Sequence, residues 1–240
     1  MSAAPTLGVL IVPARGGSDL DAALAAAGWA DVRAVLAVSP VPPPAATRDV
    51  TTLTATGDVP RLDADWVLVL FEHERIAPDA VDDLRAAVAD APADRVFALP
   101  VMASLLDMDV WLRRRVARLA PRGTPLAVGA GLSVAFAMRG RRTQPLDVTI
   151  FRARGATIDR AIDLMGAEAG ALAGLVDGLG SPRGVVRQSA RAALRGLTAR
   201  AARPPLGLGR WIVAVFEGYR VVVAYARLWE RRRDRLAVDA

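Results

Sequence analysis

Apolar and polar positions alternate in blocks along the first hundred residues, and each block has the length of a strand or of a helix. Mostly apolar runs, typical of strands that are buried on both faces, occur in five places. They are Leu7–Val12, Val32–Val38, Val50–Thr54, Asp65–Phe71 and Arg95–Pro100. Helical spacing predicts a helix between Ser18 and Gly28, and a second one over Asp79–Asp90. Strands alternating with helices in this way predict an α/β fold, with an open, mostly parallel sheet and helices on both of its faces.

The pattern changes after residue 108. Residues 109–120, DVWLRRRVARLA, have the spacing of a basic amphipathic helix. Residues 124–140 are apolar and interrupted by glycines, which favours strands. Residues 147–155, DVTIFRARG, predict a short strand followed by a turn.

The last eighty residues are helical in pattern. From Ala161 onward the helical spacing is broken only near Gly180–Pro182 and Pro204–Pro205, where proline and glycine interrupt it. We therefore expect an α/β domain over residues 1–155 and a helical C-terminal region over residues 156–240.

The last predicted helix, Gly209–Arg235, carries a stripe of charge on an otherwise apolar and aromatic surface. Its charged residues fall within an arc of roughly 100°. They are Arg210, Glu217, Arg220, Arg227 and Arg231. Charges recur too often for a transmembrane span. Two interpretations remain: a helix at a membrane interface, anchored by tryptophan and tyrosine, or a buried helix with a solvated charged stripe.

Composition excludes several kinds of site. The chain of 240 residues has no cysteine, which excludes disulfides, thiolate zinc sites and a cysteine nucleophile. Its only histidine is His73, so no metal site with two imidazoles can form. The apolar run near the N-terminus has no basic region ahead of it, which argues against a secretory signal. We expect a cytoplasmic protein, peripheral at the inner face of the cell membrane if the last helix is interfacial.

Charge is distributed unevenly. Residues 1–110 contain 16 acids and 7 arginines, whereas residues 111–240 contain 9 acids and 24 arginines. The basic second half predicts an anionic partner such as phosphate or lipid headgroups. Nucleic acid is not expected, because the basic segments lack aromatic stacking platforms and a recognition motif.

Four segments resemble the bacterial family-2 glycosyltransferases that build lipopolysaccharide core and other envelope glycans. They are GWADVRAVLAV (28–38), ADWVLVLFEHER (64–75), DVTIFRARG (147–155) and YRVVVAYARLWERR (219–232). The resemblance implies a GT-A-like, Rossmann-type fold. It also implies a nucleotide-sugar donor, a divalent cation (Mg²⁺ or Mn²⁺), and a glycan or lipid-linked acceptor. The basic second half and the last helix, rather than the resemblance, predict an anionic membrane surface as a further partner.

The chain departs from that family where the cation and the nucleotide base would be held. The acids of the family's cation motif align with Phe71 and His73, and its base-contacting aspartate aligns with Ala37. One hypothesis is a rebuilt cation site with Glu72, His73 and Glu74 as ligands. If the strand continued, its alternation would point both glutamates away from His73. The other interpretation is a polar turn in which Glu74 and Arg75 pair or face water.

Further candidates follow from the resemblance and from the turn after the first strand. An acid that activates the acceptor would follow FRARG, where Asp159 and Asp163 are available. Arg15, Gly16 and Gly17 could offer backbone N–H groups to a diphosphate at a helix start, or form a plain tight turn. Ala37 and Asp65 complete the expected donor-binding set.

A separate basic cluster, Arg113–Arg115 with Arg118, could contact phosphate or lipid headgroups or form a solvated basic face. The sequence leaves two functions open. One is an active, or impaired, glycosyltransferase. The other is a non-catalytic relative that serves as an interaction module at the membrane surface.

Overall fold

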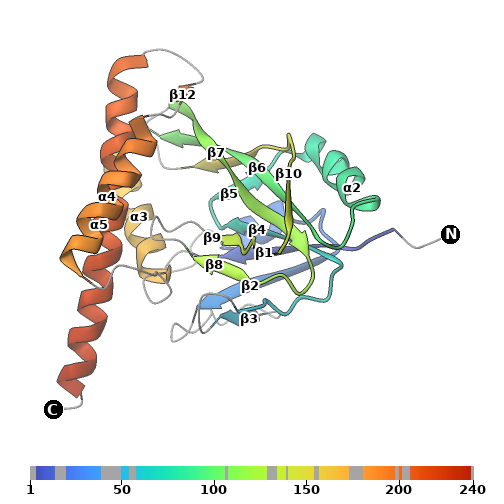
Figure 1. Cartoon of the computed structure of the whole chain (residues 1–240), viewed down its shortest axis with the longest axis horizontal. Coiled ribbons are helices and arrows are strands. Elements are labelled where there is room, and N and C mark those ends of the chain that lie inside the picture. Colours follow the sequence, from blue (N-terminus) through green and yellow to red (C-terminus); the bar gives the residue numbers. More distant parts are fainter. Residues whose placement is uncertain are drawn as a thin grey trace.

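The chain forms a central sheet with helices on both faces (Figure 1). The computed structural model describes residues 4–13, 20–38, 50–53, 58–105, 108–128, 134–138, 140–153, 157–172, 181–197, 200–201 and 206–238. The predicted α/β class, with a mostly parallel sheet, is confirmed. The predicted division at residue 155 stays a prediction.

The sheet is parallel in its first half and mixed in its second. Its strand order is β3 (Val50–Leu53), β2 (Val32–Val38), β1 (Leu7–Val12), β4 (Trp66–Phe71), β7 (Met108–Pro121), β6 (Arg95–Leu105), β11 (Ile150–Ala153) and β5 (Glu74–Ile76). Strands β3, β2, β1 and β4 run parallel, whereas β7 is antiparallel to both of its neighbours. At the far edge β11 is parallel to β6, and β5 is antiparallel to β11. Two short strands, β10 (Arg142–Pro145) and β12 (Arg200–Ala201), pair with β6 and β7.

Each face of the sheet has its own core. The alternate residues Leu7, Val9 and Ile11 of β1 pack on the side of α1 (Leu20–Ala26) and α2 (Val81–Ala89), the latter preceded by the 3₁₀ turn η1 (Pro78–Ala80). Leu10 and Val12 face the opposite side. All of β1 and β4 is buried, as their continuous apolar runs predicted.

The C-terminal helices cover the second face. They are α3 (Ile158–Leu172), α4 (Pro182–Leu197) and the long α5 (Leu206–Val238). Helices α4 and α5 add Val185, Ala192, Val221 and Ala224 to the core on that face of the sheet. The small hairpin of β8 (Leu126–Val128) and β9 (Val134–Phe136) contributes to the same core. Figure 1 shows α5 running along the outside of this layer, with α4 beside it.

The predicted helix over residues 109–120 is wrong, because these residues lie in strand β7. This strand pairs along its length with β6 and at its end with β4, for example Ala117 with Ala98 and Ala120 with Val67. Tertiary pairing on two sides therefore overrides the local helical spacing. The strand predicted over Arg95–Pro100 is confirmed and extends further, to Leu105.

The predicted solvated stripe on the last helix is wrong at its centre. Arg220 is only 3% exposed, whereas Trp211 and Val215 on the opposite side are both 63% exposed. The helix buries small residues and Arg220 against the sheet and turns large apolar side chains outward. Within the part of the chain that the structure describes, no helix has the length and apolar character needed to cross a membrane.

Candidate functional site at the carboxyl end of β4

The sheet topology marks one edge as the place where a ligand would bind. After β1 the chain moves to β2 on one side of it, whereas β4 lies on its other side. In open α/β sheets, ligands bind outside the carboxyl ends of the strands at such a switch point. The backbone N–H of Glu72, just after β4, donates to the carbonyl oxygen of Val12 at the end of β1 (3.0 Å). The two segments that follow β1 and β4 therefore start side by side.

The Glu-His-Glu segment forms a turn, but a buried one. Strand β4 ends at Phe71, Glu72 and His73 form the turn, and β5 starts at Glu74. The alternation of β4 therefore does not continue through the segment. The exposed fractions are 6% for Glu72, 6% for His73 and 2% for Glu74. The interpretation of a polar turn is confirmed for Glu74, which is paired with arginines, and for Arg75, which is exposed.

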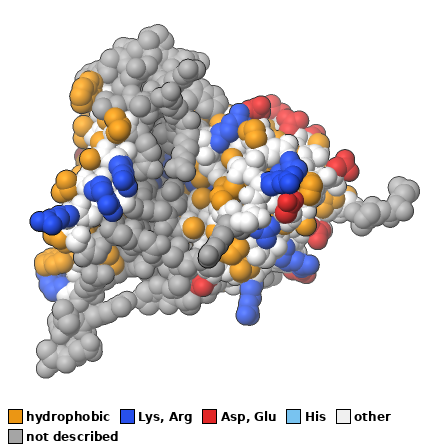
Figure 2. Space-filling model, viewed as in Figure 1, with side chains coloured by type: hydrophobic (Ala, Val, Ile, Leu, Met, Phe, Trp, Pro, Cys, Tyr) orange, Lys and Arg blue, Asp and Glu red, His pale blue; other side chains and the backbone are white. Residues whose placement is uncertain are grey.

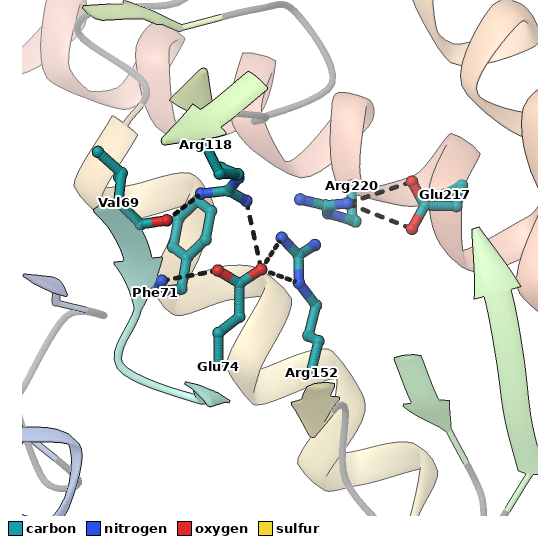
Figure 3. Close-up of polar contacts among 7 residues, drawn as sticks. All are labelled: Val69, Phe71, Glu74, Arg118, Arg152, Glu217 and Arg220. Atoms are coloured by element: carbon teal, nitrogen blue, oxygen red, sulfur yellow. Dashed lines mark hydrogen bonds and ion pairs between the residues drawn. The ribbon is translucent and has the colours of Figure 1, made fainter. Parts of the chain in front are cut away.

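Glu74 is the centre of a buried ionic cluster (Figure 3). Its Oε1 accepts hydrogen bonds from Arg118 Nη2 (3.2 Å) and Arg152 Nε (2.7 Å), and also from Arg152 Nη2. Its Oε2 accepts from the backbone N–H of Phe71 (2.8 Å). Arg118 additionally donates to the carbonyl oxygen of Val69 (3.3 Å). Three strands, β5, β7 and β11, are thus joined through one carboxylate.

The phenyl ring of Phe71 packs among the same groups. The guanidinium carbon of Arg118 lies 5.1 Å from the ring centroid and that of Arg152 lies 5.2 Å from it. The imidazole of His73 stacks on the ring with centroids 5.7 Å apart. Cations over an aromatic face are attracted by its quadrupole. An aromatic residue at this position therefore suits the arginines around it.

Helix α5 brings a further ion pair to this junction. Arg220 Nη1 donates to both carboxylate oxygens of Glu217, at 3.2 and 3.1 Å. Figure 3 shows Arg220 extending from α5 toward the guanidinium groups of Arg118 and Arg152. Three of the segments that carry the family resemblance thus meet here, through Glu74, Arg152 and Arg220.

The charge state of Glu74 follows from its surroundings. Burial by itself would raise the pKa of Glu74, but the nearby Arg118 and Arg152 guanidinium groups outweigh it, with help from His73 and the Phe71 backbone N–H. Together they lower the pKa from 4.5 to about 2. Glu74 is therefore ionised at neutral pH and permanently paired.

This arrangement does not fit Glu74 as a ligand for a divalent cation. Both of its oxygens already accept hydrogen bonds, and two guanidinium groups would repel a metal ion placed beside them. Within the described residues no group of three or more histidine or acidic side chains is arranged to hold a metal. Of the three predicted ligands, Glu72 and His73 remain as candidates.

Among the other predicted site residues, Asp65 lies apart from this cluster. Asp65 stands at the amino end of β4, where its Oδ2 accepts hydrogen bonds from the backbone N–H and the hydroxyl of Thr6 (both 2.8 Å). These two bonds lower the pKa of Asp65. Phe71 lies at the other end of β4, six residue steps or roughly 20 Å from Asp65. Asp159 and Asp163 are exposed on α3.

Several of the predicted site residues lie partly or wholly outside the described part of the chain. Arg15, Gly16, Gly17 and Ser18 lie outside the described residues. The backbone of Ala37 pairs with Thr52 near the carboxyl end of β2. In the basic cluster over residues 113–118, Arg115 is exposed and pairs with Asp147, whereas Arg118 is fully buried.

Sequence reasoning misses the burial of Arg118, which belongs to the cluster, and of Arg220, which lies beside it. The helix predicted over residues 109–120 includes Arg118, although Val116, Arg118 and Ala120 also fit the two-residue period of a strand. The pattern of the last helix predicts Arg220 on a solvated stripe. Comparison of the chain with models of known protein families and with curated proteins finds no match.

Proposed function

We propose that this protein is a glycosyltransferase-like protein that binds a nucleotide-sugar at the carboxyl ends of β1, β2 and β4. The acceptor would be an envelope glycan or a lipid-linked sugar. The observation that carries the proposal is the meeting of three resembling segments beside the switch point of the sheet. Segments far apart in the sequence have little reason to share a family pattern unless they share a scaffold.

The parallel half of the sheet supports the nucleotide part of this proposal. The order β3-β2-β1 is that of one mononucleotide-binding half of a Rossmann-type sheet, and β4 lies across the switch point as in that sheet. A GT-A-like identity of the whole fold belongs to the same proposal. A nucleotide would lie over the carboxyl ends of β1 and β2.

The residues of the ionic cluster would then hold the strands around the site in place and take no direct part in sugar transfer. Glu74 ties β5, β7 and β11 together, and Arg220 with Glu217 brings α5 to the same place. Asp159 and Asp163 are exposed and so are accessible to an acceptor hydroxyl as general bases.

A second candidate is a non-catalytic relative that keeps the scaffold for interaction alone. It is favoured by Phe71, which stands where the family has an acid and which packs among arginines. It is favoured also by Glu74, whose carboxylate is already fully engaged.

Thermal unfolding with nucleotide-sugars tests the first proposal against the second. UDP- and GDP-sugars, with and without Mg²⁺ or Mn²⁺, should raise the midpoint of unfolding. At a hundredfold excess over Kd the gain is about 2.7 kcal/mol, or roughly 5–10 °C for a chain of this size. If Glu72 holds a cation, Glu72→Gln should remove the cation-dependent part of the shift, whereas the exposed Asp90→Asn should leave it unchanged. No shift with any nucleotide-sugar would contradict donor binding and favour the non-catalytic relative.

A further inference from the structure

The outward face of α5 carries a continuous stripe of large apolar side chains. They are Trp211 (63% exposed), Val215 (63%), Tyr219 (43%), Val222 (43%) and Trp229 (53%). At 100° per residue these five positions fall within an arc of roughly 80°, and they extend over roughly 27 Å of helix. A contiguous exposed apolar surface of this kind is typical of a docking site rather than of a free surface.

Close packing fixes which way this stripe faces. Ala214 and Gly218 are buried along one flank of the stripe, and Ala224 is buried on the opposite side of α5. The hydroxyl of Ser189 on α4 donates to the carbonyl oxygen of Gly218 (2.9 Å). A Cβ at Gly218 would lie 3.3 Å from the side chain of Ala193. Because the two helices approach this closely, α5 cannot rotate to bury its aromatic side chains without losing the contact.

Arginines accompany the apolar stripe. Arg183, Arg187 and Arg191 are exposed on α4, on the same side as Val186 (69% exposed) and Leu194 (61%). Figure 2 shows hydrophobic and arginine side chains together over the helical layer, whereas the acidic side chains visible in this view gather over the sheet. Residues 182–238 contain 13 arginines and three acids.

Aromatic and basic side chains also meet at the C-terminal end of the stripe. The guanidinium carbon of Arg233 lies 5.3 Å from the ring centroid of Trp229. Tryptophan and tyrosine with neighbouring arginines are typical of helices that lie in the interface of a bilayer, where the rings enter the headgroup region and the guanidinium groups meet lipid phosphates.

We propose that the outer face of α4 and α5 docks on the surface of an anionic phospholipid bilayer. Charge decides between this partner and a second copy of the chain. In a symmetric dimer the same patch meets itself, so the arginines of α4 would face arginines. An anionic bilayer instead provides the opposite charge together with an apolar layer. This inference does not depend on sugar transfer, since it rests on α4 and α5 alone.

Vesicle binding by the full chain tests this inference. Co-sedimentation would compare phosphatidylcholine vesicles with vesicles that contain one quarter phosphatidylglycerol, at low and at high salt. We expect binding to the anionic vesicles, weakened by salt, with a shift of tryptophan fluorescence to shorter wavelength. Arg183→Gln with Arg187→Gln should weaken partitioning roughly 25-fold, since each arginine near an anionic surface contributes roughly fivefold. Trp211→Ala with Trp229→Ala should weaken it at least roughly tenfold.

Matched controls use exposed residues elsewhere. Arg122→Gln with Arg142→Gln removes the same charge from the sheet domain, and Val59→Ala removes an exposed apolar side chain there. Both controls should bind anionic vesicles as the wild type does. The inference is overturned if the wild-type protein does not bind anionic vesicles, or if the control variants lose as much binding as the variants of α4 and α5. It is also overturned if sedimentation shows a dimer that the double tryptophan variant disrupts, because the face would then join two copies.

Discussion

Replacing Glu74 with glutamine should cost about 3–5 kcal/mol of the free energy of unfolding. The substitution keeps the shape of the side chain but leaves the Arg118 and Arg152 guanidinium groups, 0% and 5% exposed, without a compensating carboxylate. Urea denaturation followed by circular dichroism measures the loss. As a matched control, Glu230→Gln removes one partner of the half-exposed pair with Arg227 and should cost less than about 1 kcal/mol.

A double variant separates an ionic cause from a packing one. Adding Arg152→Met to Glu74→Gln removes one of the two uncompensated charges, so part of the lost stability should return. The single variant Arg152→Met is measured as well. If the double variant loses as much stability as the two single variants lose in sum, the charges of Glu74 and Arg152 are not coupled and the ionic explanation is wrong. If Glu74→Gln alone does not fold, the yields of soluble protein from the single and the double variant are compared instead.

Acid should weaken the wild-type protein through the same group. Because the pKa of Glu74 falls from 4.5 to about 2 on folding, its contribution is complete above pH 4.5 and disappears as the pH falls toward 2. The loss over this range is about 3 kcal/mol. Glu74→Gln should show a smaller decline between pH 5 and pH 2 than the wild type, and an equal decline would contradict the assignment.

Gly8→Val should destabilise the protein by about 3 kcal/mol. Gly8 lies in the central strand β1, and a Cβ there would stand 2.5 Å from Leu62 Cδ2 and 2.8 Å from Ala64 Cβ. The end of the Leu62 side chain can turn away, but the Cβ of Ala64 moves only with its backbone. The backbone around Ala64 must therefore shift, which destabilises the folded protein. Urea denaturation should show this loss as a lower midpoint of unfolding.

The same substitution elsewhere provides the control. Gly166 lies inside α3, and nothing stands within 4 Å of a Cβ placed there. Gly166→Val should change the free energy of unfolding by no more than about 0.5 kcal/mol, because valine suits a helix slightly better than glycine does. Similar losses at both positions would show that the close approach of Ala64 to Gly8 is not the cause.

The apolar runs of the first hundred residues predict strands β1, β2, β3, β4 and β6, and helical spacing there predicts α1 and α2, which cover one face of the sheet. A strand buried on both faces must be apolar at consecutive positions, and Leu7–Val12 and Trp66–Phe71 are buried throughout. The starts of α4 at Pro182 and of α5 just after Pro205 agree with the breaks predicted there, because proline ends a preceding helix and is tolerated in the first turn of a new one.

The pattern of apolar and polar residues therefore predicts the α/β class, the main strands and the C-terminal helices. Long-range packing makes residues 109–120 a strand, buries Arg118 and Arg220, and turns the tryptophans of α5 outward. For Arg118 the cause is the distance of its partner along the chain. An arginine is buried only where a partner neutralises it, and Glu74 lies 44 residues from Arg118 and 78 from Arg152. No local pattern of polar and apolar residues contains that partner, so local spacing places Arg118 in water. Arg220 has a local partner in Glu217, and it is buried because α5 packs on the core of the sheet.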